Sequence, residues 1–464
     1  MRGEAGQAKP WLERRPSPVG RRSKAQETSL EVQIHACRIM TMVRSQILSP
    51  LLVVGWGIAM VGAFHDRSVF GAEWEGSLDP FFGEPVMETQ QILRHGRSQV
   101  WPNIVVALDG SVLATYGVAF GGGEPFARSP RHVALRRSEN GGETWGKEIV
   151  IAAPGFQGGG TLVDETTGDI LAFVEERHPP APLTVYRSQD HGRTWKAQAD
   201  TVVKPDRLGN VPSMHMNEHG ITLRHGRHRG RLLRAARWYA GRNQYDVYEG
   251  MYTTAVYSDD GGRTWLTSEP FPENGTGEAA VAELSTGRIY YSSRMHWFKR
   301  PQNRRRRAAW SDDGGQSWRN WEIVEALPDG QQGRVEGCLG GLVRLPVKGR
   351  DILIYSNVDT ETFDRNRITV WASFDGAQTW PVKRLVYGGP SGYSSLTAGR
   401  PGTLSEGWIY LHYHGGADHD DPVGKAHLFI PPKGSLVARF NLSWLLEGLE
   451  TGDGRVPEWL RNHR

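Results

Sequence analysis

Short runs of β-branched and aromatic residues recur along the chain, and polar turns containing glycine follow most of them. Residues 183–186 (LTVY), 254–257 (TAVY) and 368–371 (ITVW) are three examples. Such residues favour strands, and a tight polar turn after a strand starts a hairpin. The 57 Gly and 17 Trp also fit a chain of tight turns and packed aromatic rings. The pattern therefore predicts an all-β protein.

The turns share the form S-x-[DN]-x-[GA]-x-[TS]-W, which occurs five times, at residues 138–145, 188–195, 258–265, 311–318 and 373–380. In this form the Asp side chain accepts bonds from turn N–H groups, and Gly supplies a positive φ. The Trp packs beside the next hairpin. We expect the recurring Asp residues to be structural rather than catalytic. They are Asp190, Asp260, Asp313 and Asp375.

Successive copies begin 50, 70, 53 and 62 residues apart. A hairpin that recurs at this period is typical of a β-propeller, in which four-stranded sheets repeat around a central channel.

An apolar run at residues 47–64 follows Arg44 and ends in small residues. This pattern predicts a secretory signal peptide, with an N-terminal membrane anchor as the alternative. A signal peptide of ordinary length would begin at Met40 or Met42. We therefore expect residues 1–72 to be an unstructured leader with a signal peptide. The rest of the chain would be secreted or periplasmic, with no stable membrane insertion after cleavage.

The net charge of +4 comes from the leader. Residues 1–72 hold ten Lys and Arg against five Asp and Glu, which leaves −1 for residues 73–464. This balance gives no reason to expect a nucleic-acid partner. Of the two cysteines, only Cys338 lies outside the leader, so no internal disulfide or cysteine-based metal site is expected. We expect Cys338 to be a small buried apolar residue and the mature chain to be a monomer.

The repeated turn is the Asp-box, and the chain resembles the sialidase (neuraminidase) superfamily, whose members carry such BNR repeats. The resemblance implies a six-bladed β-propeller over residues 73–464, with about 65 residues for each blade. Asp-boxes also occur in propellers that are not sialidases, so by themselves they imply the fold and not the chemistry.

Sialidases act on a sugar whose anomeric carbon carries a carboxylate, which would repel a carboxylate nucleophile. A neutral Tyr assisted by a base replaces it, and Arg side chains bind the substrate acid. Residues 274–284 resemble the segment that carries the base, which would be Glu278. Sixteen residues later, Arg294 resembles one of the carboxylate-binding arginines.

Two later segments extend the resemblance. Arg365 matches the last arginine of the family, with Arg367 as the second choice on the same strand face. Residues 389–396 (GPSGYSSL) resemble the segment of the nucleophile, which would be Tyr393, 28 residues after Arg365.

Other positions depart from the family pattern. Val100 stands where the first arginine is expected, and Arg97 or Arg94 is the nearest substitute. No Asp lies between Thr115 and the first Asp-box, so Glu124 and His132 are the candidate proton carriers there. Where many sialidases have Leu-Tyr-Glu, residues 411–414 read LHYH.

Two further clusters have competing interpretations. His215 and His219 lie four apart, which could form a metal site on a helix, but the residues after them read as a strand. We expect no metal, and we expect His219 to line the substrate site. The arginine run 304–307 predicts a solvated loop, with attraction of an acidic glycan as the alternative.

The resemblance implies an exported glycoside hydrolase similar to exo-α-sialidases. It would cleave a terminal sialic acid or another acidic sugar, with Tyr393 and Glu278 catalytic and without a cofactor. Arg294, Arg365, His219, Arg97 and Glu124 would contact the sialylated or other acidic glycan. One alternative is a non-catalytic glycan-binding propeller with a degenerate sialidase site. Another is a propeller that binds protein.

Overall fold

The computed structural model describes residues 74–94, 101–119, 131–241, 248–297, 305–329, 337–360, 365–415 and 434–461. They belong to one compact unit, residues 67–464. The predicted leader, 1–72, lies outside the described residues. None of the helices in the described ranges is long and apolar enough to cross a bilayer.

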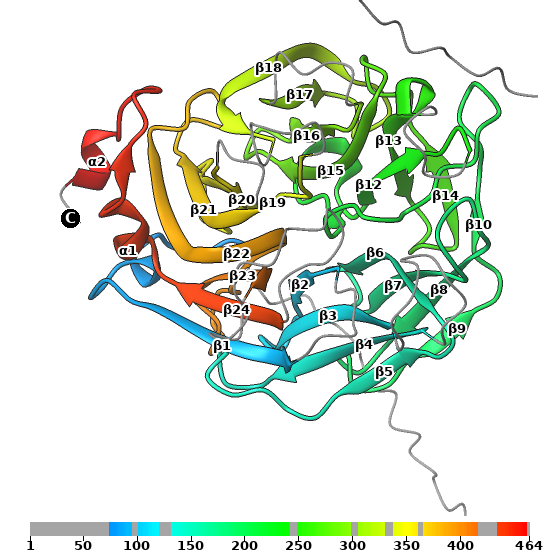
Figure 1. The fold of residues 1–464 in the computed structure, drawn as a ribbon, viewed down its shortest axis with the longest axis horizontal. Coiled ribbons are helices and arrows are strands. Elements are labelled where there is room, and N and C mark those ends of the chain that lie inside the picture. The colour runs from blue at the N-terminus through cyan, green and yellow to red at the C-terminus, as the bar shows by residue number, and fades with distance from the viewer. Residues whose placement is uncertain are drawn as a thin grey trace, which may run out of the picture. The chain divides into compact units, whose positions relative to one another are not determined.

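Five β-sheets form a ring, and within each blade most neighbouring strands are antiparallel and follow one another in the chain (Figure 1). The first blade contains β2 (Asn103–Val106), β3 (Val112–Ala119), β4 (Arg131–Ser138) and β5 (Ile149–Ala152). The second contains β6 (Phe156–Val163), β7 (Ile170–Glu175), β8 (Leu183–Ser188) and β9 (Lys196–Gln198).

The third blade contains β11 (Ile221–Thr222), β12 (Leu232–Trp238), β13 (Tyr252–Ser258) and β14 (Thr264–Thr267), with β10 (Val202–Val203) parallel to β14. The fourth contains β15 (Thr276–Glu283), β16 (Ile289–Met295), β17 (Arg305–Ser311) and β18 (Arg319–Pro328).

The eight-stranded sheet holds the last two blades, which share one long strand. β19 (Gly341–Arg344), β20 (Leu353–Val358) and β21 (Asn366–Ser373) precede β22 (Val382–Ala398), and β23 (Ile409–Gly415) and β24 (Gly434–Phe440) follow it. The first half of β22 pairs with β21, and its second half, from Ser391 onward, pairs with β23. β1 (Met87–Arg94) pairs with β24 and completes the sixth blade. The predicted six-bladed all-β propeller is therefore confirmed.

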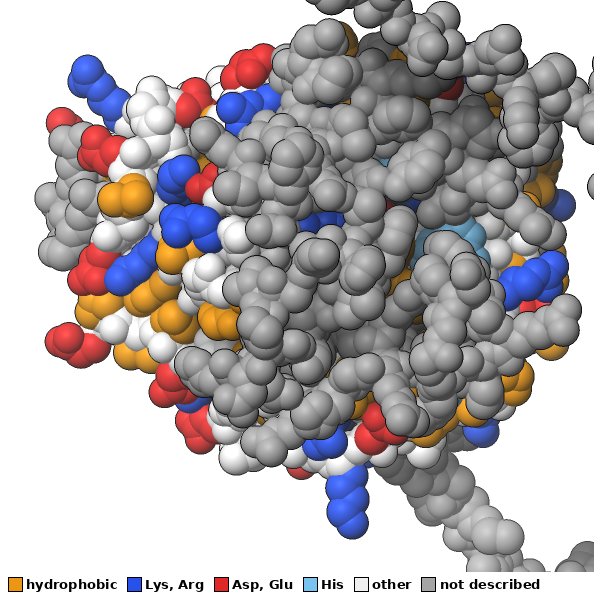
Figure 2. Space-filling model, in the orientation of Figure 1, with side chains coloured by type: hydrophobic (Ala, Val, Ile, Leu, Met, Phe, Trp, Pro, Cys, Tyr) orange, Lys and Arg blue, Asp and Glu red, His pale blue; other side chains and the backbone are white. Residues whose placement is uncertain are grey.

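Short helices and one short strand decorate the ring. They are α1 (Leu442–Leu446), α2 (Glu458–Arg461), β25 (Leu449–Glu450) and the 3-10 turns Asp79–Phe81, Gly226–His228 and Tyr248–Gly250. Around the rim in Figure 2, the visible acidic and basic side chains of the described residues are interspersed with apolar ones.

The Asp-boxes have the predicted turn geometry. In the second box Asp190 Oδ1 accepts from the backbone N–H groups of Arg193 and Thr194, at 3.1 and 2.8 Å. Gly192 has a φ of 86°, which glycine adopts without the penalty that a Cβ brings. The third box repeats the pattern, since Asp260 Oδ1 accepts from Thr264 N at 2.9 Å. The recurring Asp residues therefore hold turns together, as expected.

Packing between blades forms the core. Trp265, from the third Asp-box, is fully buried, and its ring lies 5.4 Å from that of Phe173 in the second blade. Trp380 of the fifth box is also fully buried. Cys338 is buried in the core of the last two blades, as predicted.

Candidate active site

The first strand of each blade lines the central channel, and these inner strands all point to the same end. The C-terminal residues of β2, β6, β11, β15, β19 and β22 together line a single pocket at that end. Glu278 and Tyr393 lie nearer the opposite end, toward the N-terminal ends of β15 and of the second half of β22. The second strand of each hairpin returns to this opposite end, where Arg294 and His414 lie close to the ends of β16 and β23.

Glu278 is held by arginine side chains from two strands. Its carboxylate accepts a hydrogen bond from Arg294 Nη1, and Arg237 Nη1 lies 3.9 Å from its Oε1. All three side chains are almost fully buried. Burial alone would lower the pKa of Arg294, but Glu278 and then Tyr393 raise it above its ordinary value. Arg294 is therefore a permanent cation within electrostatic reach of both Glu278 and Tyr393.

Arg365, directly before β21, and Tyr393, in β22, pack against each other. The guanidinium carbon of Arg365 lies 5.0 Å from the centre of the Tyr393 ring. Arg365 Nη2 donates to the Gly337 carbonyl at 2.7 Å, and the Arg365 carbonyl accepts from Ser391 N at 3.0 Å. Burial lowers the pKa of Arg365, but the neighbouring Cys338 and Tyr393 raise it above its ordinary value. The Tyr393 ring remains partly exposed.

The structure thus brings Glu278, Arg294, Arg365 and Tyr393 together at one end of the channel. Arg294 has one further donor, Nε–H, without a hydrogen-bond partner among the described residues. Buried donors are almost always satisfied, so this N–H and the neighbouring guanidinium of Arg365 suit an anionic ligand. Arg97 and Glu124 lie outside the described residues.

A buried ion pair, Arg306–Asp329, lies next to Arg294 and holds the backbone that carries it. Arg306 Nη1 lies 3.0 Å from Asp329 Oδ1, and both side chains are 0% exposed. Asp329 Oδ2 accepts from the backbone N–H of Met295 at 2.6 Å, which fixes the chain next to Arg294. Burial raises the pKa of Asp329, while Arg306 and Arg294 act against the shift.

The prediction of a solvated loop at 304–307 is therefore wrong for the residues that the structure describes there. They form β17, in which Arg306 is fully buried and Arg307 is 2% exposed. Arg307 Nε donates to Glu273 Oε2 at 3.1 Å. Each of these two charges has a carboxylate partner within the fold, which makes their burial tolerable. The partners lie 23 and 34 residues away in sequence, so the run alone does not reveal them.

An aromatic cluster lies on the same side of the ring as Arg237. Its members are Trp101, Phe156, His178, His215 and Tyr239, with ring centres 4.7 to 6.3 Å apart. The Arg237 guanidinium lies 4.0 Å from the Tyr239 ring and so links the cluster to Glu278. Trp101 and His178 are partly exposed. The sequence analysis did not single out Arg237, although a charged residue within the largely apolar strand β12 could have indicated a buried partner.

His215 and His219 diverge, and His219 does not join the group around Tyr393. Its Nδ1 lies 3.0 Å from the Gly220 carbonyl, and its Nε2 lies 2.8 Å from the Leu396 carbonyl. Burial lowers its pKa. Both ring nitrogens are thus engaged by backbone, and the residue lines the pocket at the other end of the channel. His132, the remaining proton-carrier candidate, has its Nε2 3.2 Å from Glu148 Oε1.

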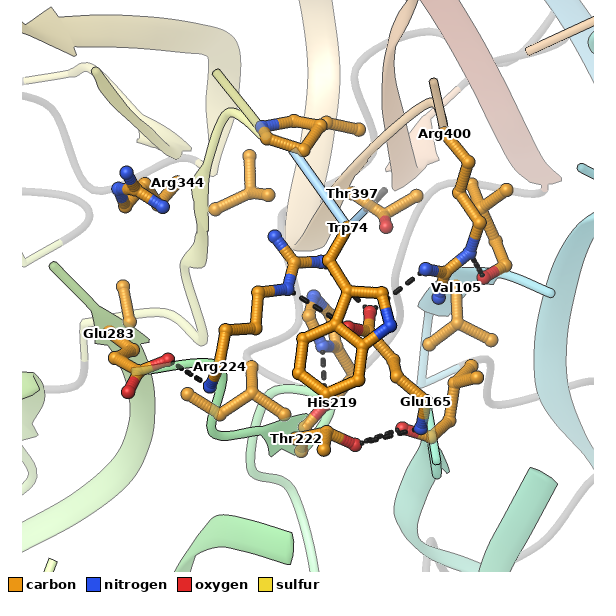
Figure 3. A pocket seen from close by; sticks show the side chains of 18 of the residues that line it. Trp74, Val105, Glu165, His219, Thr222, Arg224, Glu283, Arg344, Thr397 and Arg400 are labelled. Atoms are coloured by element: carbon orange, nitrogen blue, oxygen red, sulfur yellow. Dashed lines mark hydrogen bonds and ion pairs between the residues drawn. The ribbon is translucent and has the colours of Figure 1, made fainter. Parts of the chain in front are cut away.

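That pocket has a volume of about 100 Å³ and is lined by paired charges (Figure 3). Arg224 donates to both oxygens of Glu165, at 2.9 and 2.8 Å, and Arg400 donates to Oε1 at 2.9 Å. Burial would raise the pKa of Glu165, but these two arginines lower it to about 2. Trp74 also lines the pocket, and its ring lies at the centre of Figure 3. Arg224 and Arg400 are thus both paired with a carboxylate at this end, whereas Arg294 Nε near Tyr393 has no hydrogen-bond partner among the described residues.

The fold is that of the sialidase-like glycoside hydrolases. A model of the BNR repeat-like domain matches residues 119–405, more than half of the chain. A sialidase from Micromonospora viridifaciens is 30% identical over 449 residues, covering 86% of this chain and 60% of that protein. A sialidase from Bacteroides fragilis is 26% identical, covering 64% of this chain and 57% of that protein. The chain therefore belongs to the BNR repeat-like family of the sialidase superfamily. It spans about three fifths of the length of these two relatives.

Solved structures agree on the fold. An intramolecular trans-sialidase from Ruminococcus gnavus, in complex with oseltamivir carboxylate, has a TM-score of 0.55 at 16% identity, covering 77% of this chain and 97% of that one. An α-L-arabinanase from Penicillium chrysogenum, in complex with arabinobiose, has a TM-score of 0.50 at 15% identity, covering 79% and 100%. Glycosidases named for different sugars share this fold, so the substrate has to be inferred from the residues of the site and not from the fold.

Proposed function

We propose that this chain is an exported glycoside hydrolase similar to exo-α-sialidases, which cleaves a terminal sialic acid or another acidic sugar. Tyr393 is the nucleophile, Glu278 is its base, and Arg294 and Arg365 bind the acid group of the substrate. The observation that supports this most is that two contacting pairs, Glu278–Arg294 and Arg365–Tyr393, lie within electrostatic reach of each other, although Glu278 and Tyr393 are 115 positions apart in the sequence.

The proposed reaction begins when the substrate acid binds the two guanidiniums. Guanidinium groups suit a carboxylate because two N–H donors can match two oxygens. The substrate acid then competes with Glu278 for Arg294, and the released Glu278 carboxylate can accept the phenol proton of Tyr393. Attack of the Tyr393 oxygen on the anomeric carbon breaks the glycosidic bond and gives a glycosyl-tyrosine, while the departing sugar oxygen takes up a proton from solvent and leaves as an alcohol. Water then hydrolyses the intermediate: its hydroxyl binds the anomeric carbon, its proton restores the Tyr393 phenol, and Glu278 releases the proton that it accepted to solvent.

The neutral nucleophile matters because an anionic one would be repelled by the substrate acid. An ordinary tyrosine has a pKa near ~10, so a base is needed at neutral pH. The aromatic cluster offers flat rings, those of Trp101 and His178 partly exposed, against whose faces sugar C–H groups can pack.

The test is hydrolysis of a fluorogenic α-sialoside by the purified protein, together with a panel of acidic oligosaccharides. We expect Tyr393→Phe to abolish release, because the phenol oxygen that forms the intermediate is gone. Tyr387→Phe is the matched control, since Tyr387 lies on the same strand and its ring packs 6.2 Å from that of Tyr413. Binding without turnover on every substrate would falsify the hydrolase and leave a glycan-binding propeller.

A further inference from the structure

His414 is a buried histidine with unused hydrogen-bonding groups. It lies near the end of β23 and is 2% exposed. Neither of its ring nitrogens has a hydrogen-bond partner in the part of the chain that the structure describes. Burial lowers its pKa well below the ordinary value, and His412 and Arg365 act in the same direction. A neutral ring in this position offers one N–H donor and one acceptor nitrogen.

The ring lies against the candidate nucleophile. The ring centres of His414 and Tyr393 are 5.4 Å apart, with the planes tilted by 56°. Arg365 contacts the same tyrosine ring. A Cβ added at Gly392 would lie 3.5 Å from His414 Nδ1, so the strand beside Tyr393 also approaches the imidazole closely. His414 therefore belongs to the end of the channel that holds Tyr393.

The direction of the side chain follows from its neighbours on β23. His412 is two residues earlier and so shares a strand face with His414. His412 Nδ1 lies 3.1 Å from the carbonyl of Asn103, at the start of β2. Tyr413, on the opposite face, packs near Tyr387 instead. The face that carries His414 is thus turned toward the start of the first blade.

Packing alone does not account for this residue. The neighbouring His412 has a hydrogen-bond partner at each ring nitrogen, namely Asn103 and Ser435, whereas His414 has none among the residues that the structure describes. Buried polar groups are normally paired, and an unpaired one calls for an explanation such as a catalytic or binding role. An apolar ring could pack against Tyr393 equally well without unpaired nitrogens.

We propose that His414 is a neutral hydrogen-bonding ligand for the acid group of a sialic acid, the third after Arg294 and Arg365. It would provide a donor from the face of β23 that is turned toward the first blade. This inference rests on the proposed function, and it makes His414 a specificity-determining residue in that site.

The experiment measures calorimetric binding of 2-deoxy-2,3-didehydro-N-acetylneuraminic acid and of its methyl ester, which lacks the charge. His414→Phe keeps a ring against Tyr393 and removes both nitrogens. We expect it to weaken binding of the acid by about 10- to 100-fold, the effect of one hydrogen bond to a charged group. Binding of the ester should change less than about threefold. His414→Gln, which keeps an N–H donor, should recover part of the affinity for the acid.

The outcomes separate this inference from the proposed function. If the wild-type protein binds the acid and His414→Phe binds it equally well, the inference is overturned and the proposed function stands. An equal loss for acid and ester also overturns it, because the ring would then only shape the site. If the wild-type protein binds neither compound, the proposed sialidase function and the inference fall together. His414→Gln serves as the decisive variant if His414→Phe does not fold.

Discussion

Asp329→Asn removes one charge from the buried pair beneath Arg294 while keeping the shape of the side chain. Arg306 and Asp329 are fully buried and 3.0 Å apart. Removing one partner of such a pair leaves the other charge uncompensated, which costs about 3–5 kcal/mol. Arg306 keeps its bonds to Ser292, at 3.1 and 3.0 Å, so we expect the lower end of that range. The free energy of unfolding in urea, followed by tryptophan fluorescence, measures the loss.

A double-mutant cycle sharpens this prediction. Arg306→Met combined with Asp329→Asn should cost less than the sum of the single variants, because no buried charge is then left unpaired. Glu269→Gln is the control, since its partner Arg319 lies on β18 of the same blade as Arg306, and the Arg319–Glu269 pair is exposed and should contribute about 1 kcal/mol or less. A loss below about 1 kcal/mol for Asp329→Asn, or strict additivity in the cycle, would refute the reasoning.

Two more predictions concern stability. Burial raises the pKa of Glu218 to about 8, although the Ser395 hydroxyl acts to lower it. The stability this gives is complete below the ordinary pKa of 4.5 and is lost as the pH rises toward 8. Glu218→Gln should therefore reduce the fall in unfolding free energy between pH 5 and 8 by up to about 1.4 kcal/mol per pH unit; an unchanged slope contradicts this. Trp265→Ala should cost about 3–5 kcal/mol in the same urea assay, because the ring is fully buried against Phe173. A loss near zero would show that the Asp-box tryptophan does not hold the blades together.

The repeated elements were predictable because their structure is local. In the second Asp-box, the N–H groups that donate to Asp190 belong to residues three and four positions later, so a short sequence motif specifies the whole turn. The six blades followed from the spacing of these turns and from the family resemblance. Likewise, Glu278, Arg294, Arg365 and Tyr393 were predicted as site residues from motifs, and in the structure Glu278 contacts Arg294 and Arg365 contacts Tyr393 at one end of the channel.

The partners of these residues were not predictable from local patterns. Arg237 meets Glu278 across a boundary between blades, 41 residues apart in the sequence. Asp329 reaches Arg306 from beyond the end of β18, and the arginine run that contains Arg306 suggested solvent exposure. A buried charge is recognised by its partner, and that partner is set by how blades pack rather than by neighbours in the chain. The contacts of His219 were equally hidden from the sequence, because backbone carbonyls, one of them 177 residues away, lie within hydrogen-bonding distance of its two ring nitrogens.

The long strand β22 makes the ring less regular than a count of six blades suggests. It supplies the outer strand of the fifth blade and the inner strand of the sixth, and β1 closes that same sheet through β24. Strands in one continuous hydrogen-bonded sheet tend to open together, so the last two blades form one cooperative block beside four smaller ones. The seam where early and late parts of the chain meet lies inside the largest block. Opening the ring at the point where its two chain ends meet therefore requires breaking hydrogen bonds within the largest sheet.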